Sequence, residues 1–159
     1  MKNLHVTLCS LAALVYSVCA SAQNEKIPIN EPDYNKPRLF SNLPGRIGVS
    51  LSELELLVEA PVGSRTRMNL AAETVSSYAF DGDVVSAVSK YENRIQSVVI
   101  RSSNFNGASL TVSKIRLDDG TFTYTGRIIS FQHGDLFELK QEAGGWVFVK
   151  RNYYELINE

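Results

Sequence analysis

Three consecutive stretches decide the fold: residues 95–102 (IQSVVIRS), residues 104–107 (NFNG) and residues 109–117 (SLTVSKIRL). The first is rich in β-branched residues, which favour strands, and in the third apolar positions alternate with polar ones, as in a strand that buries one face. The middle stretch ends in Asn-Gly, a dipeptide that favours the tight turns of β-hairpins. Strand, turn and strand in this order predict an antiparallel hairpin.

Turn signals recur on both sides of this hairpin, from Asp81-Gly82 through residues 118–120 (DDG) to residues 143–145 (AGG). Asp81-Gly82 itself is expected to be a hairpin turn. Short strands with turns at such regular spacing predict an antiparallel meander, which is either a strongly curled sheet or a small barrel. Residues 153–157 are compatible with a last strand and with a helical turn. The predicted fold class is mainly β, with a minor α+β character from one helix.

That helix is short and precedes the strands. Its apolar positions recur at helical spacing: Leu51, Leu54, Leu57 and Val58. Ser52 and Glu55 have the spacing of a capping box, and Ser50 with Glu53 offers the same pattern two residues earlier. Pro61 ends the pattern. Because an isolated helix of this length is marginal in water, it is expected to pack on the sheet.

Both cysteines, Cys9 and Cys19, lie within the first 22 residues. The same stretch combines Lys2, an apolar run over residues 8–18 and the small-x-small sequence of residues 20–22. This pattern predicts a signal peptide over residues 1–22, and therefore an exported protein, periplasmic or secreted and of bacterial type, with no integral membrane span after cleavage. The minor alternative is a lipid anchor at Cys19.

Residues 23–46 are predicted to form an extended arm, and residues 47–159 a single β-rich domain. The arm contains four prolines: Pro28, Pro32, Pro37 and Pro44. Proline restricts its own φ and favours an extended predecessor. Leu39, Phe40 and Leu43 are candidates to dock the arm on the domain. The tentative binding residues all lie in the arm: Tyr34, Lys36, Arg38, Leu39 and Phe40.

Catalytic and cofactor motifs are sparse. Ser130, His133 and Asp135 are close in sequence, but Ser130 lacks the flanking glycines of a nucleophile elbow, so a polar turn is the preferred interpretation. His133 is the only histidine after residue 22, and no cysteine follows that residue. We therefore predict no catalytic residues, no cofactor and no metal. The acidic residues of the turns are interpreted as turn-formers rather than as calcium ligands: Asp81, Asp83, Asp118 and Asp119.

The formal net charge is −1, and Lys150-Arg151 is the only adjacent pair of basic residues, so nucleic-acid binding is not expected. The predicted function is that of an exported, non-enzymatic interaction protein, whose narrowest form is an inhibitor or partner of a secreted protease. The alternative is a protein that binds a small apolar ligand in a cavity inside the meander. An enzyme that uses carboxylates and His133 ranks third. The expected partner is another exported protein, and a free sheet edge also allows a homodimer.

Overall fold

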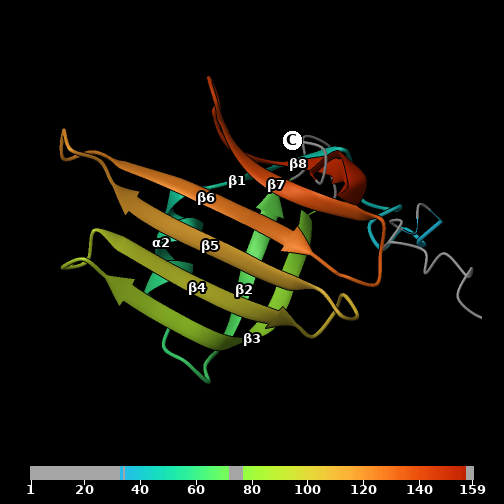
Figure 1. Cartoon of the computed structure of the whole chain (residues 1–159), viewed down its shortest axis with the longest axis horizontal. Helices are drawn as coiled ribbons and strands as arrows, with labels where there is room; N and C mark the ends of the chain where they lie inside the picture. The colour runs from blue at the N-terminus through green and yellow to red at the C-terminus, as the bar shows by residue number, and fades with distance from the viewer. Residues whose placement is uncertain (1–32, 34, 72–76, 157–159) are drawn as a thin grey trace, which may run out of the picture. The chain divides into compact units, whose positions relative to one another are not determined.

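The computed structural model of the chain describes residues 33, 35–71 and 77–156. The predicted signal peptide, the start of the arm and Tyr34 lie outside the described residues. The described residues form eight strands, one α-helix and one short 3₁₀ helix, which confirms the mainly β fold (Figure 1). In this part of the chain, neither helix is long and apolar enough to cross a membrane.

The strands follow one another as an antiparallel meander. Their bounds are β1 (Arg46–Val49), β2 (Arg65–Ala71), β3 (Ser77–Lys90), β4 (Ile95–Ser102), β5 (Ser109–Arg116), β6 (Phe122–Ile129), β7 (Asp135–Glu142) and β8 (Gly145–Asn152). Helix α2 (Leu51–Glu59) lies between β1 and β2. The 3₁₀ helix η2 (Tyr153–Leu156) follows β8, so the helical interpretation holds at the C-terminal end.

Strand β1 connects the two ends of the curled sheet. It pairs with β8 over four residue pairs, from Arg46–Val149 to Val49–Trp146. Its pairing with β2 rests on one residue pair among the described residues, Gly48–Ala71. The order of hydrogen-bonded strands is therefore that of a closed barrel, while the shape is that of a strongly curled half-barrel sheet.

Helix α2 packs on β2, β4 and β5. Its N-cap is Ser50, whose Oγ accepts a hydrogen bond from the backbone N–H of Glu53 at 3.2 Å. The structure therefore uses the earlier of the two capping pairs. Leu54, Leu57 and Val58 are buried as predicted, whereas Leu51 is half exposed because it lies at the first helical position, off the packed face.

Aromatic side chains fill the interior of the sheet. Phe80, Phe137 and Phe148 are at most 1% exposed, and Phe40 of the arm joins them. The ring of Phe40 packs edge-on against Phe105 and Phe137, with centroid distances of 5.5 and 5.3 Å. These residues occupy much of the interior that the alternative ligand-binding hypothesis assigned to a cavity.

The predicted hairpin turn at Asp81-Gly82 is wrong. Strand β3 runs through both residues and pairs with β2 and β4 on its two sides. A Cβ atom at Gly82 would lie 2.3 Å from the backbone oxygen of Arg101, so glycine is needed here for the close approach of two strands rather than for a turn. Pairing on both sides of β3 outweighs the local turn preference of the dipeptide.

Candidate functional site

Strands β6 and β7 pair over only part of their length. Three residue pairs join them: Arg127–Glu138, Ile128–Phe137 and Ile129–Leu136. Beyond Arg127–Glu138 the two strands diverge, and the β7–β8 hairpin curves away from β6 (Figure 1). We call the resulting groove the β6–β7 cleft; it is bounded by residues 123–127 of β6, residues 138–141 of β7 and Trp146 of β8.

Both edges of the β6–β7 cleft present main-chain groups. The N–H of Leu117 donates to the carbonyl of Thr121 at 2.8 Å, which fixes the odd-numbered residues of β6 as those that face β5. Because successive residues of an antiparallel strand alternate in direction, the N–H and C=O of Phe122 and Tyr124 point towards the cleft. The same alternation, counted from the Ile128–Phe137 pair, directs Gln141 of β7 into it. No residue pair joins β6 to β7 at these positions in the described structure.

The floor of the β6–β7 cleft is aromatic. Tyr124 and Trp146 pack edge-on at a centroid distance of 5.4 Å, and both side chains are largely buried. Leu139 lies beside them, opposite Gly126, where a Cβ atom would come within 2.8 Å of the carbonyl oxygen of Thr111. A side chain at residue 126 would therefore force β6 away from β5. The cleft encloses about 760 Å³, which is within the range of ligand-binding sites.

The outer rim of the β6–β7 cleft is basic. The carboxylate of Glu138 lies 2.8 Å from Lys140 Nζ, 3.5 Å from Arg127 Nη2 and 3.8 Å from Arg151 Nε. Partial burial favours the neutral acid, but Lys140 and then Arg127 outweigh this effect, so the pKa of Glu138 is lowered. One carboxylate thus faces three cations.

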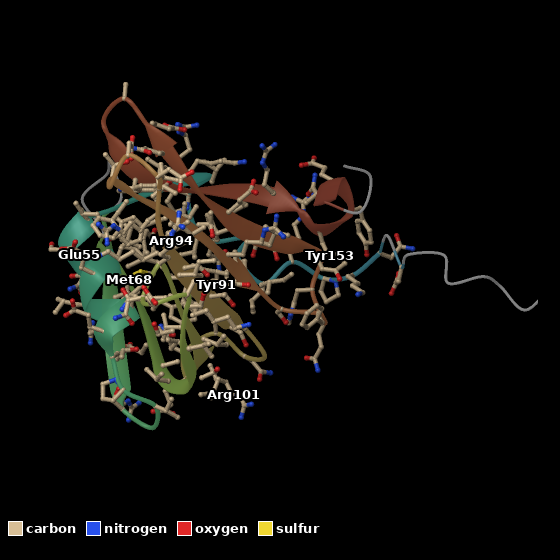
Figure 2. The ribbon with its side chains drawn as sticks, turned by 60° about the vertical axis from the view of Figure 1, so that its left-hand side comes forward. Glu55, Met68, Tyr91, Arg94, Arg101 and Tyr153 are labelled. Carbon is tan, nitrogen blue, oxygen red and sulfur yellow. The ribbon has the colours of Figure 1, made fainter. Side chains whose placement is uncertain are left out.

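A second charged group lies on the inner side, beneath the cleft. Lys114 Nζ is 3.5 Å from Glu55 of α2 and 4.5 Å from the centroid of the Phe122 ring. Figure 2 shows Glu55 on the helix. Burial disfavours the charged amine, but Tyr124 and Glu55 together outweigh it and raise the pKa of Lys114. Burial, helped by the nearby Glu55, outweighs the effect of Lys114 and raises the pKa of Tyr124, so the phenol is neutral near neutral pH. Its hydroxyl donates to Glu55 Oε1 at 3.4 Å.

Amide hydrogen exchange checks the direction of these backbone groups. In the free protein, the amides of Phe122 and Tyr124 are expected to exchange at least about tenfold faster than those of Thr123 and Thr125, which face β5. The measurement is residue-resolved exchange by NMR. The amide of Ile128, which pairs with β7, serves as a protected control. Equal protection at all five residues would show that β6 is covered on both sides.

The predicted binding residues of the arm are largely occupied by contacts within the protein. The N–H groups of Leu39 and Phe40 donate to the two carboxylate oxygens of Asp135 at 2.7 and 2.9 Å. Lys36 Nζ donates to the carbonyl of Phe131 at 2.8 Å, and Arg38 is exposed. The five predicted binding residues therefore do not form one site. Leu39 and Phe40 are held by Asp135, Lys36 contacts Phe131, and Arg38 is exposed. Tyr34 lies outside the described residues.

Lys150 also holds the arm. Its Nζ donates to the carbonyl oxygens of Phe40, at 2.6 Å, and Leu43. Burial lowers the pKa of Lys150, and the nearby carboxylate of Asp135 only partly opposes this effect. Asp135 thus accepts hydrogen bonds from backbone N–H groups of the arm, and Lys150 donates hydrogen bonds to backbone carbonyl oxygens of the same short stretch.

The structure divides the polar residues 130–135 between two contacts. Ser130 Oγ and His133 Nδ1 are 2.8 Å apart, whereas the carboxylate of Asp135 accepts hydrogen bonds from the arm. A nucleophile and base of the triad type need a third group that orients the base. Among the described residues, no cluster of three or more His, Cys, Asp or Glu side chains could hold a metal ion.

Sequence reasoning did not find the β6–β7 cleft. Its one local signal is Gly126, a glycine inside a stretch that otherwise reads as a continuous strand and that therefore indicates a bend or a close backbone approach. Comparison of the chain with protein-family models, with curated proteins and with solved structures found no match.

Proposed function

We propose that this protein is a non-enzymatic binding module that holds an extended segment of a partner protein in the β6–β7 cleft. The observation that carries the proposal is the unpaired main chain of Phe122 and Tyr124 at one edge of the cleft, beside an aromatic floor. An extended segment that adds to such an edge gains main-chain hydrogen bonds, and its alternate side chains enter the groove.

The arrangement favours a chain over a small apolar molecule. Both edges of the cleft present backbone donors and acceptors, which a peptide satisfies and a hydrocarbon leaves unpaired. The interior positions of the sheet are largely filled by phenylalanines and aliphatic side chains, and the β6–β7 cleft lies at the surface. The length of the free edge, from Phe122 to Thr125, suits a segment of about four residues.

The sequence supports the kind of partner. The predicted signal peptide at residues 1–22 favours a partner that is itself exported, and a secreted protease is its narrowest form. Such a partner would be bound through an extended segment of its own, because the arm of this chain is tied to Asp135 and Lys150.

The test titrates the protein with a blocked octapeptide of alternating Thr and Val and follows amide exchange by NMR. Binding is expected to slow exchange at Phe122 and Tyr124 and to leave Thr123 unchanged. A blocked octapeptide with proline at alternate positions lacks the required N–H groups and is expected to have no effect.

A matched pair of variants locates the binding surface. Thr125→Trp places a bulky side chain at the exposed rim of the cleft, and Val88→Trp places it on exposed β3 of the same sheet. We expect Thr125→Trp to abolish the exchange effect and Val88→Trp to preserve it. Retained protection in Thr125→Trp, or no protection of the wild-type protein at any peptide concentration, contradicts the proposal.

A further inference from the structure

We infer that the segment bound in the β6–β7 cleft alternates acidic and apolar residues. This inference rests on the proposed function and adds the chemistry of the partner. It comes from two observations. The outer rim carries more positive than negative charge, and a strand in the cleft would meet charged side chains on its outer face and apolar ones on its inner face.

The imbalance is centred on Glu138. Its side chain is only 15% exposed, while Arg127, Lys140 and Arg151 around it are 52%, 44% and 41% exposed. A single carboxylate compensates one of three cations, so about two positive charges stay accessible to a ligand. Charges of one sign around a groove attract a partner of the opposite sign and set its register.

Two other cations near the cleft are paired. Lys114 pairs with Glu55 on the inner side, and Arg46 pairs with Glu142 at the end of β7. The unbalanced charge around Glu138 lies at the outer rim, at the point where the pairing of β6 with β7 ends.

A strand added to β6 would present its side chains alternately to the two faces of the sheet. Residues that point outward meet Arg127, Lys140 and the hydroxyl of Thr125. Residues that point inward meet Leu139 and the Tyr124–Trp146 pair. Acidic residues suit the first set of positions and apolar residues the second. Over the four residues of the free edge, this gives two of each kind.

The test compares three blocked octapeptides in which Val alternates with Glu, Thr or Lys. At low salt the Glu peptide is expected to bind about tenfold more tightly than the Thr peptide, as two half-exposed ion pairs would give, and the Lys peptide more weakly than both. The advantage of the Glu peptide should decline as salt is raised. Equal or tighter binding of the Thr or Lys peptide overturns the inference.

Charge variants assign the preference to the rim. The double variant Arg127→Gln/Lys140→Gln should bind the Glu and Thr peptides equally, without loss of affinity for the Thr peptide. Arg67→Gln/Arg101→Gln removes the same charge elsewhere, and it should keep the tenfold preference. Arg67 lies on β2, four strands from β6, and Arg101 lies at the opposite end of the view from the β7–β8 hairpin (Figure 2). An equal loss in both double variants would show attraction by overall charge and not by the cleft.

Glu138→Gln gives a test of opposite sign. It removes the one carboxylate that competes with the ligand, so the Glu peptide is expected to bind several-fold more tightly and the Thr peptide to be unaffected.

The peptide titrations also separate this inference from the proposed function. Protection of Tyr124 by the Thr peptide without a preference for Glu leaves strand addition standing and removes the acidic partner, whereas no protection by any peptide removes both.

Discussion

Phe40→Ala is expected to lower the free energy of unfolding by about 3–5 kcal/mol, the range found when a buried phenylalanine is truncated. Phe40 is 1% exposed and packs between Phe105 of the β4–β5 connection and Phe137 of β7. Truncation leaves a cavity between elements that approach each other from different parts of the chain, so the site has little freedom to collapse. Urea denaturation followed by fluorescence of Trp146 measures the loss.

Phe131→Ala is the matched control for this prediction. Phe131 is 71% exposed, and its ring packs edge-on against Tyr153 at a centroid distance of 6.5 Å. Its truncation is expected to change stability by less than about 1 kcal/mol. A loss of stability for Phe40→Ala as small as that expected for Phe131→Ala would mean that the arm does not belong to the core.

Asp135→Ala is expected to cost about 3–5 kcal/mol. The side chain is 2% exposed, and its two oxygens accept the backbone N–H groups of Leu39 and Phe40. Without the carboxylate, both amides lose their partners, and the half-buried amine of Lys150 loses the negative charge that opposes the lowering of its pKa. The loss therefore combines unpaired donors with an uncompensated cation.

Asp135→Asn separates these two causes. Its amide keeps one acceptor oxygen but no charge, so we expect a smaller loss than for alanine and a further lowering of the pKa of Lys150. Asp83→Ala, an exposed aspartate on β3, should be nearly neutral and serves as control. Chemical denaturation gives the stabilities, and NMR titration of Lys150 gives its pKa. An Asp135→Ala protein as stable as the wild type would refute the proposed role of this carboxylate in holding the arm.

The fold was largely predictable because its signals are local. The alternation over residues 109–117, the Asn-Gly at residues 106–107 and the capping pattern near Ser50 each act within a few residues, and the structure keeps all three. The turn prediction at Asp81-Gly82 was wrong because Asp-Gly can form a hairpin turn but can also lie inside a strand that closely approaches its neighbour. Pairing with β2 and β4, which the sequence does not show, decides between the two.

The β6–β7 cleft could not be predicted from the sequence. It depends on where the pairing of two adjacent strands ends, and β6 and β7 each read as complete strands. The role of Asp135 was hidden for a related reason. Its neighbours in sequence, Ser130 and His133, suggested a polar turn, while its hydrogen-bond partners lie 95 and 96 residues away in the arm. Long-range pairing of this kind leaves no local pattern.

The aromatic contacts of the arm have a mechanical consequence. The rings of Phe40, Phe105 and Phe137 join the arm, the β4–β5 connection and β7 at the end of the β6–β7 cleft where three residue pairs connect β6 with β7. We therefore expect this end of the cleft to be its most rigid part, and a bulky segment to be accommodated at the opposite end.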